Sequence, residues 1–191
     1  MNILGEKIST LFDKPVYNHL QLSDCVVKVT KNPKEYEILM DLYHDNIIRP
    51  IDIIQEIDNY YIILPKLDKF DIIPSYRQIT ELLDAIHYIY NKKIRHFDIH
   101  SGNIMINKKT DKLILIDFGN SYRITDNDKI DMELNSFART IIVHIRGLFY
   151  PEIYNNKDLV SIMNTLYPLL IPFFIPESIL EFAKSFSYII N

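Results

Sequence analysis

The chain reads RHFDIHSGNIMINKKTDKLILIDFGNS over residues 95–121, and this stretch decides how the rest of the sequence is interpreted. It carries an acidic residue near each end, Asp98 and Asp117, and Asn103 follows the first of them by five positions. Two short apolar runs flank a polar turn at residues 107–112, a pattern that predicts loop, strand, turn, strand and loop. Two carboxylates and an amide on such a hairpin can bind Mg²⁺ and orient a nucleophile, because their oxygens are hard ligands.

The stretch resembles the catalytic core of the protein kinase superfamily, in which the catalytic loop reads H-R-D-x-x-x-x-N and the metal-binding loop reads D-F-G. The corresponding residues here are His96-Phe97-Asp98 with Asn103, and Asp117-Phe118-Gly119. Each motif alone is a modest signal, so the resemblance rests on their order, on their spacing and on the hairpin between them. The form D-x-H-x-G-N around Asp98 is similar to that of haspin-type protein kinases, and also to that of aminoglycoside and choline kinases.

The resemblance implies an α+β, bilobal protein-kinase-like fold in a single domain over residues 1–191. We expect residues 1–64 to form a small N-terminal β lobe with one helix. Residues 65–67 are expected to be the hinge, and residues 68–191 a reduced, mostly helical C-terminal lobe.

The composition is that of a globular protein, with 191 residues of which 48% are hydrophobic and 24% charged. The net charge of −4 argues against nucleic acid as a partner, because neutralising phosphates requires a basic face. The first ten residues lack a basic head followed by an apolar block, so we expect no signal peptide. The most apolar stretch, residues 166–176, is too short and proline-broken to span a bilayer. A single cysteine, Cys25, fits a reducing compartment. We therefore expect a soluble monomer without a membrane partner, in the cytoplasm or, for a viral source, in the host cytoplasm.

Residues 1–30 predict three strands, the last containing Val26-Val27-Lys28-Val29. The resemblance aligns Lys28 with the lysine of the family's V-A-I-K strand, which pairs with ATP phosphates. An isolated strand lysine would otherwise be read as merely exposed. In the register that best fits the glycine-rich pattern G-x-G-x-x-G-x-V, its defining positions fall on Gly5, Lys7, Thr10 and Phe12. Only Gly5 is a glycine there, so tight closure of the backbone over phosphates is in doubt.

Asn32-Pro33 predicts a helix start, with Asn32 as N-cap and the helix running over about residues 33–43. The resemblance makes Glu35, in the first turn, the partner of Lys28, with Glu37 as the alternative. A helix dipole alone also favours acidic residues in this turn.

Two apolar runs, residues 51–54 and 60–64, surround a polar turn and predict a second hairpin. Pro65-Lys66-Leu67 then breaks the strand pattern, and the resemblance makes these residues the hinge that meets the adenine edge. Leu64 would be the gatekeeper of that pocket. A plain edge turn would show the same pattern.

Residues 75–91 predict an amphipathic helix that leads into the catalytic loop. Its apolar stripe consists of Ile79, Leu82, Leu83, Ile86, Ile89 and Tyr90. After Gly119 the chain departs from the family: no A-P-E motif follows, and the connection over residues 120–132 is short. Residues 133–145 predict a further apolar helix, and residues 150–191 predict one or two more.

The resemblance implies that ATP and Mg²⁺ are the cofactors. Asp117 and Asn103 would hold the metal, and Lys28, fixed by Glu35, would contact the α and β phosphates. The rest of the nucleotide site is expected to include Gly5, Leu64, Lys66 and Leu67.

Asp98 is expected to orient the acceptor hydroxyl and to take its proton. His100 would lie near the γ-phosphate with a pH-dependent charge, the alternative being a histidine packed under the loop. Phe97 stands where the family has arginine, which can pair with a phosphorylated activation loop, so we expect activity that does not need loop phosphorylation.

The leading functional hypothesis is ATP-dependent phosphoryl transfer to a serine or threonine hydroxyl of a protein. One alternative is a small-molecule kinase of the aminoglycoside or choline kinase type, which His100 and the short connection after Gly119 favour. The other is a catalytically weak pseudokinase that acts as a binding decoy, which the poor glycine-rich loop favours.

Overall fold

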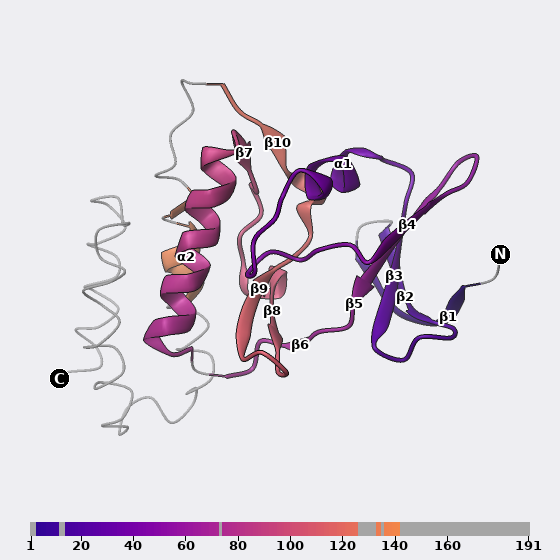
Figure 1. Cartoon of the computed structure of the whole chain (residues 1–191), viewed down its shortest axis with the longest axis horizontal. Helices are drawn as coiled ribbons and strands as arrows, with labels where there is room; N and C mark the ends of the chain where they lie inside the picture. Colours follow the sequence, from indigo (N-terminus) through magenta and orange to yellow (C-terminus); the bar gives the residue numbers. More distant parts are fainter. Residues whose placement is uncertain (1–2, 12–13, 73, 126–132, 135, 142–191) are drawn as a thin grey trace.

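A computed structural model describes residues 3–11, 14–72, 74–125, 133–134 and 136–141 of the chain (Figure 1). The N-terminal part is a five-stranded antiparallel sheet in the order β1-β2-β3-β5-β4. Its strands are β1 (Leu4–Leu11), β2 (Lys14–His19), β3 (Cys25–Thr30), β4 (Asp52–Gln55) and β5 (Tyr60–Pro65). The three strands predicted before residue 30 and the hairpin predicted after residue 50 are therefore confirmed.

One helix accompanies this sheet, α1 (Lys34–Met40), and it is shorter than the predicted one. Pro33 occupies the N-cap position, and the side chain of Asn32 accepts a hydrogen bond from the backbone N–H of Lys34 at 3.0 Å. The helix ends because the N–H of Asp41 bonds to the carbonyl of Ile38, three residues back, which tightens the last turn.

The long helix is α2 (Tyr76–Asn91), as the apolar stripe predicts. Ser75 is its N-cap and forms a capping box with Gln78, so both ends of that first turn have their donors satisfied. The buried face consists of Gln78, Ile79, Leu82, Leu83, Ala85, Ile86 and Ile89.

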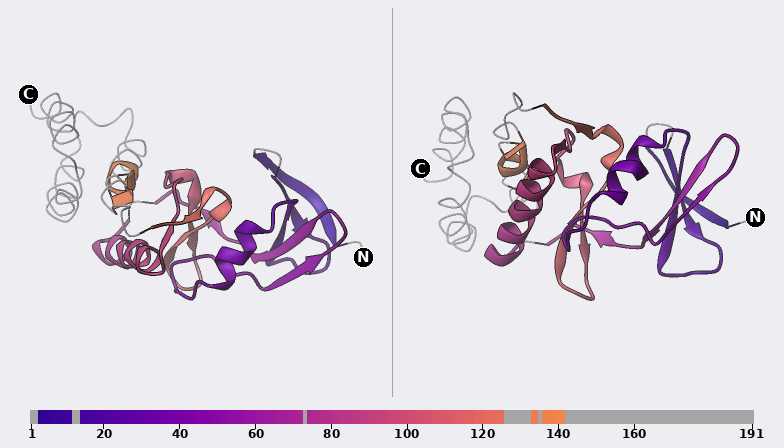
Figure 2. Two further views of the ribbon diagram at one scale, coloured as in Figure 1. Left: turned by 90° about the horizontal axis from the view of Figure 1, so that it is seen from above. Right: turned by 45° about the horizontal axis from the view of Figure 1, so that its top comes forward.

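The stretch that opened the sequence analysis folds as predicted into a hairpin, β8 (Ile104–Asn107) with β9 (Lys112–Leu115). The two-residue strand β6 (Asp68–Lys69) extends it to a three-stranded sheet. On either side of the hairpin lie two 3-10 turns, η1 (Ser101–Asn103) and η2 (Phe118–Asn120). The two-residue strands β7 (Ile94–Arg95) and β10 (Tyr122–Arg123) pair with each other, before and after the segment that contains η1, the hairpin and η2. Figure 2 shows the five-stranded sheet and α2 at opposite ends, with the hairpin between them.

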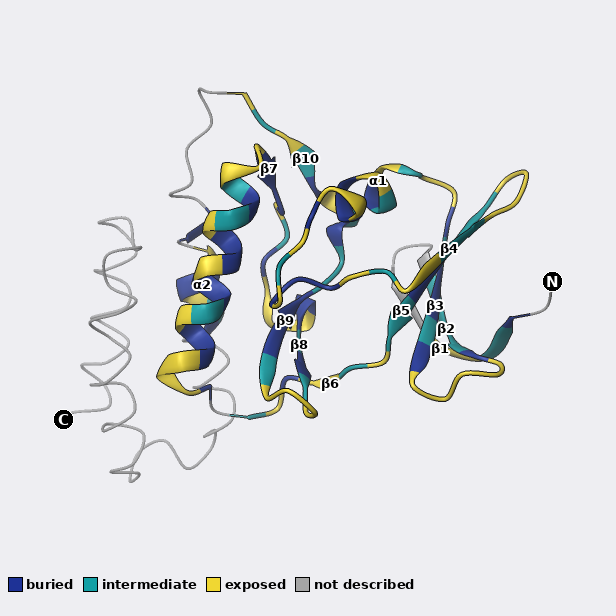
Figure 3. Ribbon diagram, in the orientation of Figure 1, coloured by how far each residue is buried: buried dark blue, intermediate teal, exposed yellow. Residues whose placement is uncertain are grey.

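The main hydrophobic core lies away from the five-stranded sheet (Figure 3). It joins α1, residues 47–48, α2, the hairpin and helical residues of the segment 133–141. The sheet has a smaller cluster of its own, formed by Ile3, Cys25, Val27 and Ile63. Helix α1 thus packs its apolar side on the core of α2 and the hairpin, which fixes it relative to the catalytic loop.

Of the elements predicted after Gly119, the structure describes the start of one. Residues 133–134 and 136–141 are helical, and the rest of the predicted helix to residue 145 lies outside the described residues. The helices predicted over residues 150–191, and with them the reduced C-terminal lobe, also lie outside them. In the described ranges no helix has the length and hydropathy needed to cross a membrane.

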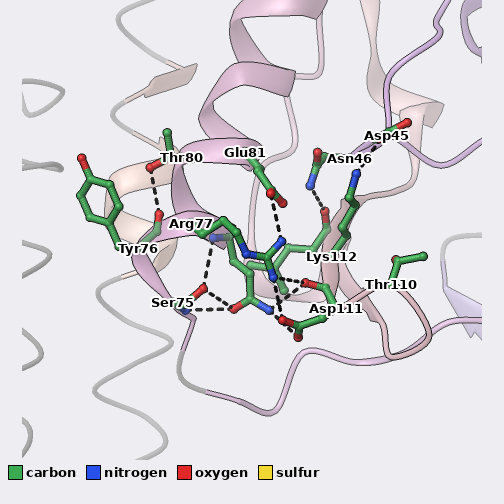
Figure 4. Close-up of polar contacts among 12 residues, drawn as sticks. Asp45, Asn46, Ser75, Tyr76, Arg77, Thr80, Glu81, Thr110, Asp111 and Lys112 are labelled. Atoms are coloured by element: carbon green, nitrogen blue, oxygen red, sulfur yellow. Dashed lines mark hydrogen bonds and ion pairs between the residues drawn. The ribbon is translucent and has the colours of Figure 1, made fainter.

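Figure 4 shows how the turn of the hairpin is tied to the start of α2. Asp111 has a left-handed backbone (φ 54°) and its carboxylate accepts from Arg77 at 2.7 Å and from Gln78 at 2.9 Å. Gln78 also donates to the Asp111 carbonyl at 3.1 Å, while its Oε1 accepts from the N–H of Ser75 at 2.9 Å. The buried Gln78 therefore satisfies groups of both the helix cap and the turn.

His96 ties the catalytic loop to the strand that precedes D-F-G. Its imidazole is fully buried, with Nε2 2.9 Å from the carbonyl of Ile116 and Nδ1 accepting from the N–H of Asp98 at 3.3 Å. The ring packs edge-on against Phe118, with centroids 4.6 Å apart. Burial lowers the pKa of His96 to about 4, so the ring is neutral, donating from Nε2 and accepting at Nδ1.

Replacing Gln78 tests the tie between hairpin and helix. We expect Gln78→Ala to lower the free energy of unfolding by about 1–3 kcal/mol, because it leaves buried polar groups without partners. Arg77→Ala, whose side chain is 51% exposed, should cost only about 0–1 kcal/mol. Urea unfolding of both variants measures the difference, and equal losses would contradict a special role of Gln78.

The buried neutral His96 predicts that stability falls in mild acid. Its pKa is about 4 in the folded protein against 6.5 as the ordinary value, so its contribution is complete above pH 6.5 and is lost as the pH falls towards 4. The full loss amounts to about 3 kcal/mol. Carboxylates also titrate in this range, so the readout is the difference in unfolding free energy between wild type and His96→Asn. That difference should shrink as the pH falls from 6.5 towards 4, and a difference that stays constant over this range would contradict the assignment.

Candidate active site

A cleft of about 560 Å³ lies between the five-stranded sheet and the hairpin. The sheet side is apolar, with Ile8, Val16 and Val26, and the hairpin side carries Ile104 and Ile116. Polar groups gather at one end, where Lys28, Glu35, Asn103 and Asp117 reach the cleft wall. An apolar slot with a few convergent polar groups is the form expected of a small-molecule site.

Lys28 lies between two carboxylates that come from distant parts of the chain. Its Nζ is 2.6 Å from Oε1 of Glu35 on α1 and 2.7 Å from Oδ1 of Asp117 after β9. The side chains of Lys28 and Glu35 are 6% and 4% exposed, whereas that of Asp117 is 36% exposed. Glu35 is thus the internal partner of the ammonium, as predicted over Glu37, and Asp117 is the partner open to the cleft.

Asp117 adopts a left-handed backbone (φ 59°), an uncommon conformation for a residue other than glycine. Its Oδ1 accepts from the N–H of Gly119 at 3.2 Å and so caps turn η2. Phe118 is fully buried in the core of α2 and the hairpin. The strained backbone is therefore held by an anchored phenyl ring on one side and by the Lys28 ion pair on the other.

Asp98 is held by two asparagines. Its Oδ2 accepts from Nδ2 of Asn103 at 3.2 Å and from Nδ2 of Asn120 at 3.1 Å. Asn103 also donates to the Asp98 carbonyl at 2.9 Å, which directs its own side-chain oxygen elsewhere. The structure thus brings Asp98 and Asn103 together as predicted, and it adds Asn120, which the sequence analysis did not single out.

His100 stands next to this carboxylate on the other side. Its Nε2 lies 3.6 Å from Oδ1 of Asp98, beyond hydrogen-bond length, and its Nδ1 accepts from the N–H of Gly102 at 3.1 Å. The Gly102 N–H therefore selects the tautomer with the proton on Nε2 whenever the ring is neutral. A Cβ at position 102 would lie 2.9 Å from the His100 ring, so the glycine keeps the ring where it is. The ring is 54% exposed, which excludes the alternative of a histidine packed under the loop.

Glu133 is a second residue that the sequence analysis missed. Its Oε1 accepts from the N–H of Phe97 at 2.8 Å, and Phe97 has a left-handed backbone (φ 63°) directly before Asp98. Burial raises the pKa of Glu133, while the N–H of Phe97 and the charge of Arg95 oppose the rise. No local pattern marks Glu133, because its partner Phe97 lies 36 positions away in the chain.

The predicted hinge residues line the cleft. Leu64, Pro65, Lys66 and Leu67 all reach its wall, at the end of β5. The N–H of Lys66 donates to the carbonyl of Asp24 at 2.8 Å, and its Nζ donates to the side chain of Asn18 at 2.9 Å. The segment is therefore fixed to β2 and to the residue that precedes β3.

Gly5 is not among the residues that line the cleft. Gly5 lies on β1 outside the cleft wall, where a Cβ would be 3.0 Å from the carbonyl oxygen of Asn18 on β2. The residues of this hairpin that line the cleft are Ile8 and Val16. With Val16 at the last position of G-x-G-x-x-G-x-V, the glycine positions hold Ser9, Leu11 and Lys14. The register of the sequence analysis followed Gly5, which in the structure lies where β1 and β2 approach closely.

The charges fit a divalent cation. Two carboxylates, those of Glu35 and Asp117, contact Nζ of Lys28. Among the described residues no cluster of three or more His, Cys, Asp or Glu side chains could hold a metal by itself. Mg²⁺ commonly takes one or two protein ligands and keeps waters or phosphate oxygens for the rest. Asp117 and the side-chain oxygen of Asn103, both on the cleft wall, suit that mode.

Comparison with known proteins agrees with this geometry. The family model described as protein kinase domain matches residues 19–143, more than half of the chain. An inferred serine/threonine-protein kinase of Acanthamoeba polyphaga mimivirus is 28% identical over 79% of this chain and 64% of its own length. A protein of Fowlpox virus, also named as an inferred serine/threonine-protein kinase, is 34% identical over 35% of this chain and 22% of its own length.

Death-associated protein kinase 2 of Mus musculus is 31% identical over 49% of this chain and 29% of its own length. The chain thus spans less than two thirds of the length of each of these relatives. The family match covers β3, α1, the hinge, α2 and both loops of the hairpin, which are the elements that build the cleft. The chain belongs to the protein kinase domain family.

Proposed function

We propose that this protein transfers the γ-phosphoryl group of ATP to a serine or threonine hydroxyl of a protein. The observation that carries the proposal is Lys28, held by Glu35 and by Asp117 at one end of an apolar cleft. An apolar slot accommodates a base, and an ammonium at its end meets the phosphates. The relatives named as serine/threonine-protein kinases support the choice of acceptor.

In this proposal each residue of the site has its own role. Leu64, Lys66 and Leu67 border the adenine, Lys28 contacts the α and β phosphates, and Glu35 keeps that ammonium in place. Asp117 and Asn103 hold Mg²⁺, which neutralises charge on the phosphates when bound. The Gly102-bound tautomer of His100 offers its Nε2–H beside Asp98, where the transferred group would lie.

Asp98 acts on the acceptor. In the described part of the chain its Oδ1 accepts no hydrogen bond, whereas Oδ2 accepts two. A hydroxyl placed at Oδ1 donates its proton there as its oxygen forms the bond to the γ-phosphorus, and the bond from that phosphorus to ADP breaks. The proposed setting is the cytoplasm, supported by the single cysteine, which is a buried free thiol.

Phosphoryl transfer tests this assignment directly. The protein is incubated with labelled ATP and Mg²⁺ alone, with a protein lysate, and with a metabolite pool. We expect label in proteins, a loss of about 10²–10⁴-fold for Asp98→Asn, and a thermal shift by Mg-ATP that this variant keeps. Lys28→Met and Asp117→Asn should lose the shift as well. Asp84→Asn, an exposed carboxylate on α2, is the matched control and should behave as wild type.

Each other outcome selects a different function. Label confined to metabolites would replace the acceptor by a small molecule, which the D-x-H-x-G-N loop also fits. No transfer together with no thermal shift would favour a binding module that has lost the chemistry.

We also expect the protein to be active without phosphorylation of the segment after D-F-G. Ser121 is buried and its Oγ donates to the carbonyl of His96 at 3.2 Å, so a phosphate does not fit there. Phe97, not arginine, precedes Asp98. Phosphatase treatment should leave the rate of transfer within about twofold, and Thr125→Ala should do the same. Strong activation by an upstream kinase at Thr125 would contradict this expectation.

A further inference from the structure

We infer that Asn120 is a positioning residue of the reaction, whose side-chain amide turns Asp98 so that only Oδ1 faces the acceptor. The inference rests on the proposed function, in which Asp98 takes the proton of the hydroxyl. Asn120 lies directly after D-F-G, and no motif of the sequence marks it. It reaches Asp98 across 22 positions of the chain, with Nδ2 3.1 Å from Oδ2.

The two 3-10 turns present their last residues to the same oxygen. Asn103 ends η1 and Asn120 ends η2, and both donate to Oδ2 of Asp98. Each turn begins after a residue whose side chain accepts from the turn's own backbone: His100 for η1 and Asp117 for η2. The base is therefore held from the catalytic loop and from the metal loop at once.

A carboxylate can rotate and exchange its two oxygens, so its direction depends on what binds it. Two amide donors on Oδ2 fix the rotation and leave Oδ1 as the oxygen with capacity to accept. Asn103 cannot do this alone, because its amide also donates to the Asp98 carbonyl and its side-chain oxygen is assigned to the metal. Among the described residues, the side-chain amide of Asn120 donates to no second acceptor, so it is the dedicated donor.

The backbone around Asn120 is fixed in advance. Phe118 is fully buried on one side of Asn120. Ser121, which follows Asn120, donates its N–H to the Phe118 carbonyl at 3.1 Å and its hydroxyl to the His96 carbonyl. Turn η2 itself depends on the left-handed Asp117 and its bond to the Gly119 N–H. A change in the metal loop that dissolves this turn would therefore withdraw Asn120 and release the base, which couples the two loops.

Three substitutions separate hydrogen bonding from shape. Asn120→Ala removes the donor, and we expect kcat to fall about tenfold with the dissociation constant of Mg-ATP unchanged within about twofold. Asn120→Asp keeps the shape but sets a second carboxylate against Oδ2, so kcat should fall at least as far. Asn91→Asp, an exposed residue at the end of α2, adds the same charge away from the site and should leave kcat unchanged.

The outcomes decide the inference. Wild-type kcat in Asn120→Ala, or in Asn120→Asp, would overturn it, since either shows that the donor is not needed. A parallel loss of Mg-ATP affinity would also overturn it, because Asn120 would then act through the nucleotide. Failure of the proposed function is recognised separately, by wild-type protein that transfers nothing to proteins.

A measurement that needs no turnover distinguishes failure of this inference from failure of the proposed function. The side-chain amide of Asn120 gives its own signals in a ¹⁵N correlation spectrum, and its bond to Oδ2 predicts that Asp98→Ala shifts them. The signals of Asn91 serve as the internal control and should not move. Unchanged Asn120 signals would refute the contact itself, whether or not the protein transfers phosphate.

Discussion

The contact on which the site depends is one ammonium shared by two carboxylates. Lys28 comes from β3, Glu35 from α1 and Asp117 from the end of the hairpin, and Nζ lies within 2.7 Å of both acids. A buried ion pair of this kind is costly if one partner is removed, because the remaining charge is left without compensation. The strand, the helix and the hairpin must therefore all be in place for the ion pair to form. The position of the five-stranded sheet relative to the hairpin is tied to the chemistry of the cleft.

Packing fixes the positions of the residues that form the ion pair. Helix α1 has only seven residues, too few for stability on its own, and its Ile38 and Leu39 belong to the core that α2 and the hairpin share. Residues 46–48 run beside β9, where the N–H of Ile48 donates to the carbonyl of Leu115 at 2.9 Å. Glu35 is thus placed by the large core and Lys28 by the sheet, and the contact between them joins the two.

The elements were largely predictable from the sequence, because strand alternation, the stripe on α2 and the Asn32-Pro33 start are local signals. The Lys28–Glu35 pair was reached only through the family resemblance, since nothing local distinguishes Glu35 from Glu37. The role of Gly5 cannot be read from the sequence alone, because a glycine at a close approach of two strands looks like one in a phosphate loop. Asn120 and Glu133 escaped because their partners, Asp98 and Phe97, are 22 and 36 positions away, and contacts at that separation leave no pattern in one sequence.

The carboxylates of the site are compensated in two ways. Glu35 and Asp117 contact the ammonium of Lys28, whereas two side-chain amides bind Asp98. His96 cannot help, because burial lowers its pKa to about 4 and it is neutral near pH 7. Asn103 and Asn120 stabilise the charge of Asp98 with dipoles and leave its sign unchanged. The proposed Mg²⁺ would meet the carboxylate of Asp117, which is 36% exposed and lines the cleft.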